Sequence, residues 1–223
     1  MGTVPPPRAG VVGMLTQSAG VGAIMLAKAV STGVGISTFL STGGYADITA
    51  NDVMHFWAED DATSVCLLSL DRVGNPRKFF RILRDLTARK PVVVFTPSRA
   101  LRSARWDLTH DLPGATPDAI DQVIEAAGAI VVRHRDEMFD VARILARQPV
   151  PRGRRVRVVS NSPGLVDQVD QAAARWELRS VKPHVVASDD VVGGIVEQVE
   201  QSLEDPAVDV VLPALVEVTE SDR

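Results

Sequence analysis

A turn of small residues could bind an anion near the start of the chain. Thr16-Gln17-Ser18-Ala19-Gly20 follows the first apolar run and precedes a helix-length stretch. Ser18 suits the N-cap position, and Ala19 and Gly20 would leave the first helical N–H groups open to a phosphate. A phosphate seat and a purely structural turn both agree with this sequence. No Gly-Lys-Ser/Thr follows, so it is not a P-loop, and the full Gly-x-Gly-x-x-Gly pattern is missing.

Other reactive side chains form no cluster along the chain. His55 and His134 are expected at the surface or in packing roles, and His184 has no partner at metal-ligand spacing, so no metal site is predicted. Cys66 lies in an apolar run and is expected to be a small buried hydrophobe. The basic stretch 99–105 could neutralise a phosphate-bearing ligand, although a solvated loop is the simpler interpretation.

Composition excludes several classes of partner. The chain has 223 residues with 24 Lys+Arg and 28 Asp+Glu, a formal net charge of -4. Charges of both signs are interspersed, which does not favour nucleic acid or an anionic membrane surface. No apolar run approaches the roughly 20 residues of a membrane span, and the single cysteine fits a reducing compartment. We therefore expect a soluble, cytoplasmic protein.

Short apolar runs alternate with amphipathic stretches from Gly10 onward, the pattern of strands and helices in a parallel sheet. This predicts an α/β, doubly wound domain over 10–147, preceded by a proline-rich linker over 1–9. The expected strands are 10–15, 36–40, 64–69, 91–95 and 129–132. The expected helices are 19–32, 50–58, 76–88, 117–127 and 136–146.

A second series begins after a linker at 148–154, which contains two prolines and a glycine. The expected elements are a strand at 155–160, a helix at 163–176, a short strand near 184–187, a helix at 190–203 and a strand at 207–212. They make only about half of a doubly wound domain, since such domains usually run to about 100 residues or more. Residues 155–223 are therefore expected to form a second, incomplete α/β lobe.

Six motifs follow one another in the first part of the chain. They are Gly10–Gly20, Ser41–Asp47, Asn51–Val53, Trp57–Asp60, Asn75–Phe79 and Lys90–Val94. Such an ordered series is more specific than a lone glycine loop. In this order the motifs resemble one family, the ADP-forming acyl-CoA (acetyl-CoA) synthetases with their succinyl-CoA ligase-like flavodoxin domain. The resemblance implies a flavodoxin-like fold of the succinyl-CoA synthetase type.

The resemblance also implies a phosphohistidine. In this family a loop histidine accepts the phosphoryl group of an acyl phosphate and passes it to ADP on an ATP-grasp domain. The matching segment is 109–115, which makes His110 the candidate carrier. A neutral imidazole is a competent nucleophile near neutral pH. The residue that orients the histidine corresponds to Asp71, where glutamate is usual.

Two helix N-termini from two domains hold the phosphate in this family. The first is the helix capped by Ser18, with Ala19 and Gly20. The second corresponds to the helix entered at Ser162 and Gly164, with Pro163 at the first helical position. We therefore predict phosphate-binding residues in both parts of the chain.

Three departures from the family pattern concern these same parts. Asp111 directly follows His110, and a carboxylate there would repel a phosphoryl dianion. The turn before Gly164 is shorter than usual and lacks extra glycines. Asp71 also reaches less far than glutamate. A working and a lost phosphotransfer site both remain open.

Two functions follow. The first is a phosphohistidine-carrier segment or subunit of a ligase that converts acyl-CoA, ADP and phosphate to acid, CoA and ATP, incomplete without CoA-binding and ATP-grasp domains. The alternative is a non-catalytic regulatory or scaffold module linked to a GNAT lysine acetyltransferase. We expect no cofactor bound by this chain alone, with CoA, ADP/ATP and Mg in the complete system, and possible self-association through the second lobe.

Overall fold

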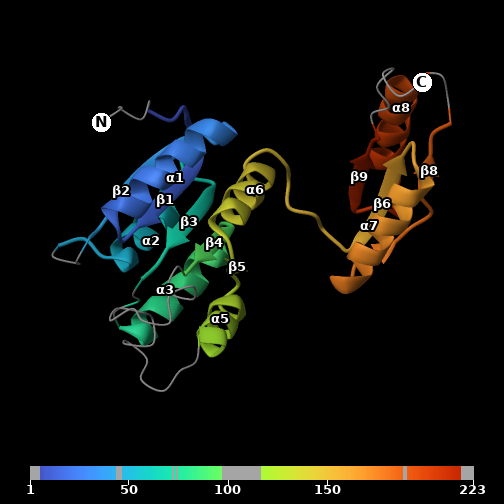
Figure 1. Cartoon of the computed structure of the whole chain (residues 1–223). Coiled ribbons are helices and arrows are strands. Elements are labelled where there is room, and N and C mark those ends of the chain that lie inside the picture. The colour runs from blue at the N-terminus through green and yellow to red at the C-terminus, as the bar shows by residue number, and fades with distance from the viewer. Residues whose placement is uncertain are drawn as a thin grey trace. The chain divides into compact units, whose positions relative to one another are not determined.

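The structure is a computed structural model that describes residues 6–43, 47–71, 73, 75–96, 117–187 and 190–216. The chain forms two compact units, unit 1 (Met1–Gln148) and unit 2 (Pro149–Arg223). Figure 1 labels their helices and strands except β7. No helix in the described part of the chain is both long enough and apolar enough to span a membrane.

Unit 1 contains a parallel sheet of five strands in the order β2-β1-β3-β4-β5. This is the flavodoxin-like strand order, and it confirms the predicted fold. Its strands are β1 (Ala9–Thr16), β2 (Ile36–Ser41), β3 (Val65–Ser69), β4 (Val92–Phe95) and β5 (Ile130–Val132). Its helices are α1 (Ala19–Thr32), α2 (Ala50–Glu59), α3 (Pro76–Thr87), α5 (Pro117–Ala126) and α6 (Arg135–Leu145).

Alternate residues of the strands enter two separate cores, one on each face of the sheet. In β3, Val65 and Leu67 join the core with α1 and α6, whereas Cys66 and Leu68 join the core with α2, α3 and α5. This is the period-2 pattern of a strand, but both faces are apolar because helices cover both. The nearly continuous apolar runs of the sequence result from this double burial.

Close packing of α2 on the sheet depends on a glycine. A Cβ atom at Gly13 of β1 would lie 2.6 Å from the ring of Trp57, whose side chain is fully buried. The C-terminal end of α2 is also held by Lys90, whose Nζ donates to the carbonyl oxygens of Trp57 and Asp60. These contacts hold the end of α2 against β1 and against the residues that lead into β4.

Unit 2 contains β6 (Arg155–Ser160), α7 (Pro163–Arg175), β7 (Arg179–Ser180), β8 (His184–Val185), α8 (Val191–Glu204) and β9 (Val210–Ala214). All its strands run parallel to β6. β9 pairs with Val156–Ser160, whereas β7 and β8 pair with the two ends of the same strand. β7 and β8 therefore lie along one edge of β6 as two halves of an interrupted strand, and β9 lies along the other.

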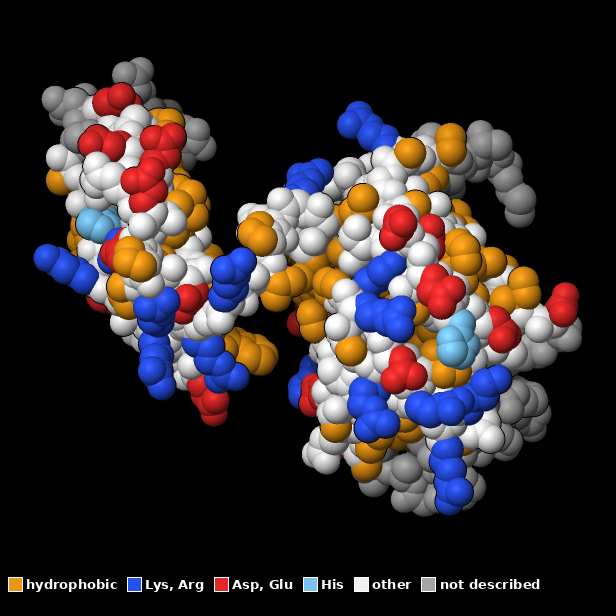
Figure 2. All heavy atoms as spheres, turned by 180° about the vertical axis from the view of Figure 1, so that it is seen from behind, with side chains coloured by type: hydrophobic (Ala, Val, Ile, Leu, Met, Phe, Trp, Pro, Cys, Tyr) orange, Lys and Arg blue, Asp and Glu red, His pale blue; other side chains and the backbone are white. Residues whose placement is uncertain are grey.

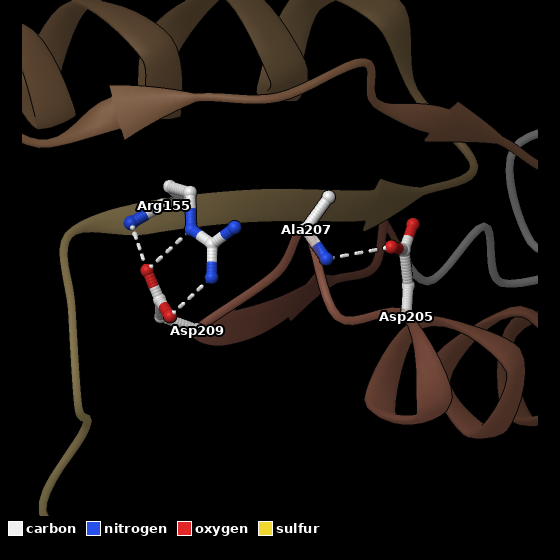
Figure 3. A network of polar contacts seen from close by, with 4 residues as sticks. All are labelled: Arg155, Asp205, Ala207 and Asp209. Carbon is white, nitrogen blue, oxygen red and sulfur yellow. Dashed lines mark hydrogen bonds and ion pairs between the residues drawn. The ribbon is translucent and has the colours of Figure 1, made fainter.

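A polar network joins the starts of β6 and β9 (Figure 3). The guanidinium group of Arg155 donates two hydrogen bonds to the carboxylate of Asp209, at 2.9 and 2.8 Å, and its backbone N–H donates a third at 2.9 Å. These bonds lower the pKa of Asp209 from its ordinary value of 3.8 to about 2. Bidentate geometry of this kind holds the two strands in register.

Unit 2 repeats the first half of unit 1. The order β7/β8-β6-β9 corresponds to β2-β1-β3, with α7 and α8 in the places of α1 and α2. After α1, Gly33 has φ 68°, and the N–H of Val34 donates to Ala29. After α7, Glu177 has φ 56°, and the next N–H likewise donates five residues back.

The turns before the third strands also agree. The carboxylate of Asp60 accepts from the N–H of Ala62 at 3.2 Å, and that of Asp205 accepts from Ala207 at 2.8 Å. Both aspartates cap the C-terminal end of the preceding helix. The two βαβαβ segments can therefore be compared residue by residue from these turns.

Candidate functional site

The described candidate residues of unit 1 lie at the topological switch point of its sheet. The chain passes from β1 outward to β2 and then returns across β1 to β3, so the connections leave β1 and β3 in opposite directions. Thr16 at the end of β1 lies opposite Ser69 at the end of β3. Ligands of open α/β sheets bind in the crevice beyond the carboxyl ends of such strands.

The turn after β1 is held by its own hydroxyl groups. The Thr16 hydroxyl donates to the carbonyl oxygen of Ser18 and accepts from the N–H of Ser18, both at 3.2 Å. Ser18 is the N-cap of α1, and its Oγ accepts from the N–H of Val21 at 3.4 Å. The N–H groups at the start of α1 are therefore presented by a fixed turn, as anion binding requires.

Two glycines at the start of α1 have different surroundings. A Cβ atom at Gly20 would meet nothing within 4 Å, whereas one at Gly22 would lie 2.9 Å from Phe39 and from Thr16. Gly22 is thus required by the packing of α1 on the sheet. Gly20 and the neighbouring Ala19 are exposed, and no described residue lies close enough to require a small side chain at position 20. The open space there is accessible to a ligand.

Asp71 follows β3 and is tied to the turn after β1. Its backbone N–H donates to the Gln17 side-chain oxygen at 2.6 Å. The side chain is half-buried, and this burial raises the pKa of the carboxyl group. A positively charged imidazolium beside it would stabilise the carboxylate form. This contact between two distant segments was not predicted from the sequence.

Unit 2 contains a turn of the same construction after β6. The hydroxyl of Ser160 donates to the carbonyl oxygen of Ser162 and accepts from its N–H, at 3.2 and 3.0 Å. Ser162 is the N-cap of α7, although its side chain makes no capping hydrogen bond, and Pro163 is at the start of the helix. A Cβ atom at Gly164 would meet only the Ser162 Oγ, at 3.8 Å.

The residue in unit 2 that corresponds to Asp71 is Val216. Ser160 pairs with Ala214 as Thr16 pairs with Ser69, and Val216 follows two residues later as Asp71 does. The amide side chain of Asn161 bonds both the N–H and the carbonyl oxygen of Val216, each at 2.9 Å. In each turn a side-chain oxygen, from Gln17 or Asn161, thus accepts from the backbone N–H two residues after the third strand, and the described residue that donates is Asp71 in unit 1 and Val216 in unit 2.

The remaining predicted residues are placed as follows. His110, Asp111 and the basic stretch 99–105 lie outside the described residues, so the role of His110 stays a prediction. Among the described residues there is no group of three His, Cys, Asp or Glu that could hold a metal ion. Cys66 is buried, and burial raises its pKa to about 12, which keeps the thiol protonated and unreactive.

Three histidines lie within the described part. His55 and His134 are exposed, which is the first of the two placements, surface or packing, expected from the sequence. His184 is partly exposed, and burial, followed by the charges of Arg157 and Lys182, lowers its pKa. None of them lies at the switch point of unit 1.

Residues 9–145 match the family described as succinyl-CoA ligase like flavodoxin domain. The chain is 26% identical over 226 residues to the alpha subunit of ADP-forming acetate–CoA ligase II from Pyrococcus furiosus, covering 91% of this chain and 49% of the relative. It is 29% identical over 161 residues to the ADP-forming 4-hydroxybutyrate–CoA ligase of Nitrosopumilus maritimus, covering 71% of this chain and 23% of the relative.

Among solved structures, the chain is similar to the dinucleotide forming acetyl-coenzyme A synthetase 1 of Ca. Korarchaeum cryptofilum in complex with phosphate and ADP. The TM-score is 0.82 at 23% identity, over 95% of this chain and 51% of that one. The chain therefore spans about half the length of this structure and of the Pyrococcus subunit. Because the family match extends over most of the chain, from residue 9 to 145, this protein belongs to the succinyl-CoA ligase like flavodoxin domain family.

Proposed function

We propose that this chain is the phosphohistidine-carrying segment of an ADP-forming acyl-CoA ligase, with His110 as the carrier. In the proposed reaction, acyl-CoA and phosphate give an acyl phosphate and CoA. A nitrogen of His110 then attacks the phosphorus, and the carboxylate leaves as the free acid. ADP finally takes the phosphoryl group, which gives ATP and regenerates the histidine.

The observation that supports this proposal most strongly is the bond between Gln17 and Asp71 at the switch point. It holds the backbone of Asp71 next to the turn that presents the N-terminus of α1. A carboxylate that accepts a hydrogen bond from one imidazole nitrogen leaves the other nitrogen free to act as nucleophile. The helix N-terminus favours the phosphoryl group that the nitrogen receives.

We assign separate roles to the predicted residues. Ser18, Ala19 and Gly20 would bind the phosphoryl group at the site in unit 1 through backbone N–H groups. Ser162 and Gly164 would serve the same purpose in unit 2. Because Val216 stands where unit 1 has Asp71, the second turn would hold a phosphoryl group without orienting the histidine through a carboxylate.

CoA, nucleotide and Mg would be bound by other parts of the complete ligase. The described residues of this chain include no cluster of carboxylates or histidines suited to a metal ion. The relatives are named as ADP-forming ligases, and the chain corresponds to about half of the Pyrococcus alpha subunit. CoA-binding and ATP-grasp domains are therefore the partners we propose, and a cytoplasmic location stays a prediction.

The test is ATP formation from acyl-CoA, ADP and phosphate by this chain combined with CoA-binding and ATP-grasp domains. His110→Ala should abolish ATP formation. Asp71→Asn should lower the rate by about 100-fold or more, the scale on which an orienting carboxylate acts on a catalytic histidine. Exposed His55 provides the matched control, because His55→Ala should leave the rate unchanged. Unchanged rates in both site variants would refute the assignment.

The alternative of a regulatory module linked to an acetyltransferase rests on the departures at His110, Asp71 and the second turn. No specific feature of the described structure favours it over the carrier role. If this chain with His110 intact formed no ATP when combined with the CoA-binding and ATP-grasp domains, the carrier proposal would fail and the regulatory alternative would be favoured.

A further inference from the structure

The outer surface of α8 and β9 in unit 2 corresponds to a surface of unit 1 against which further elements of that unit pack. In unit 1, β4 pairs with the outer edge of β3, and α3 packs against α2. In the described part of unit 2, β9 pairs only with β6, and no helix lies where α3 lies in unit 1. Unit 1 therefore provides a template for what this surface of unit 2 can accommodate.

The alignment of α2 with α8 is fixed by their capping residues, Asp60 and Asp205. It pairs Ala50 with Ile195 and Trp57 with Ser202, and all four of these residues are buried. The sides of α2 and α8 that face their own sheets therefore agree. Differences between the two helices must arise on their outer sides.

The outer sides differ sharply in exposure. Asn51 of α2 is 8% exposed, whereas its counterpart Val196 is 51% exposed. Ala58 is partly buried against the core of unit 1, whereas its counterpart Leu203 is 70% exposed. At both positions the residue of α8 is more exposed than its counterpart in α2 and also more apolar, with valine in place of asparagine and leucine in place of alanine. An apolar stripe of this kind on a helix marks a surface that packs against another element.

Charge identifies the kind of helix that fits. From Asp190 to Asp205, α8 and its caps contain five acidic residues and no lysine or arginine. In unit 1, α3 and the residues that follow it are rich in basic side chains, and Lys90 bonds the carbonyl oxygens at the end of α2. Figure 2 shows acidic and hydrophobic side chains next to each other on the face of unit 2 in view. A basic amphipathic helix would complement this surface.

The outer edge of β9 can accept a strand, with one limitation. In β3, the N–H groups of Cys66 and Leu70 donate to the carbonyl oxygens of Pro91 and Phe95 beside β4. The corresponding donors are Val211 and Leu215. Between them, at the position of Leu68, lies Pro213, which has no N–H group to donate. Strand pairing there would be short, so the contact with α8 must supply most of the binding.

We propose that α8 and β9 form a docking surface for a helix-then-strand segment of polypeptide from outside these 223 residues. The helix of this segment is basic and amphipathic and packs on Val196, Val199 and Leu203. Its strand pairs in parallel with β9. A second copy of this chain is disfavoured as the occupant, because it would bring two acidic α8 helices together. The inference concerns unit 2 alone and does not depend on phosphorylation of His110.

A graft tests this directly in the full chain. Residues 72–95, which contain α3 and β4, are placed after Val216, because Val216 corresponds to Asp71. Amide hydrogen exchange of α8 and β9, measured by mass spectrometry, should slow by at least about tenfold. The matched control graft carries Asp in place of Phe79 and Leu83, two buried residues on the apolar side of α3. It should leave exchange unchanged.

Substitutions on the surface itself complete the test. In the grafted chain, Val196→Asp with Leu203→Asp should remove the slowing, whereas Val185→Asp, at an exposed residue on the opposite edge strand β8, should not. The proposal is overturned if exchange is unchanged by the graft, slows equally in the control graft, or stays slow in the Val196/Leu203 variant. It is also overturned if the ungrafted chain is a dimer in analytical ultracentrifugation and these two substitutions dissociate it, since a second copy would then be the occupant.

Discussion

Gly20 and Gly22 should respond in opposite ways to the same substitution. In either helical position, replacing glycine with alanine gains about 0.5–1 kcal/mol by reducing the freedom of the unfolded chain. At Gly20 this gain stands alone, because the new Cβ would meet nothing within 4 Å. At Gly22 it is offset, because the Cβ would lie 2.9 Å from Phe39 and Thr16, and overpacking costs about 1–3 kcal/mol. We expect Gly20→Ala to be more stable than Gly22→Ala by about 1–3 kcal/mol.

Urea denaturation with tryptophan fluorescence can measure this difference in unit 1 alone. The chain has three tryptophans, and Trp57 is buried in unit 1. Replacing Trp106 and Trp176 by phenylalanine leaves Trp57 as the only reporter, which avoids mixing the transitions of the two units. If Gly22→Ala proved as stable as Gly20→Ala, the close approach of α1 to the sheet would be wrong. In the recombined ligase, Gly20→Ala should also slow ATP formation, because its Cβ fills the space assigned to phosphate.

Three further substitutions test the electrostatics and the backbone. Arg155 lowers the pKa of Asp209 from 3.8 to about 2, so the stability that this ion pair gives unit 2 is present above pH 3.8 and is lost as pH falls through about 2. Urea midpoints measured at stepped pH should therefore show the native protein losing its stability advantage over Asp209→Asn across that interval. Glu177→Gly should stabilise unit 2 by about 0.5–1 kcal/mol in the same assay, because a residue with a side chain is strained at φ 56° and the lost ion pair with Arg154 is exposed and contributes little. Arg154→Gln removes the ion pair alone and measures its contribution. Burial raises the pKa of Asp71, so the contribution of this carboxyl group to the stability of unit 1 is largest below pH 3.8, where the group is neutral, and is lost as pH rises through the folded pKa. Asp71→Asn should therefore be more stable than the native unit 1 at pH 7 but not near pH 3. An equal difference in stability at both pH values would contradict the burial of the carboxylate.

Long helices and strands could be predicted from the sequence where capping residues mark their ends and their apolar residues pack against the core. The helix expected at 76–88 is observed as Pro76–Thr87, where Asn75 caps the first turn and Phe79 and Leu83 face the core. The strand order of unit 1 followed from the family resemblance, because apolar runs identify strands but not their neighbours. Two-residue β7 was missed, since Arg179-Ser180 has no apolar pattern and pairs only with the start of β6.

Other features depend on contacts that local patterns do not encode. The strand expected at 207–212 is observed as Val210–Ala214, because Asp205 caps α8 and bonds the N–H of Ala207, which delays the start of β9. The bond from Asp71 to Gln17 joins residues far apart in the sequence. One signal could have revealed this arrangement, the repetition of Thr16-Gln17-Ser18-x-Gly as Ser160-Asn161-Ser162-x-Gly.

Direct detection of the phosphorylated residue tests the central proposal most sharply. The chain is incubated with radiolabelled acyl phosphate, alone and with the CoA-binding and ATP-grasp domains, and the label is located by its acid lability, its alkali stability and mass spectrometry. We predict strong labelling of His110 only with the added domains, because Asp111 repels the phosphoryl group in the isolated chain. His110→Ala should remove the label, and ADP should discharge it from the native protein as ATP. Failure to label in the presence of the added domains, or label that persists in His110→Ala, would contradict the assignment of His110 as the phosphoryl carrier.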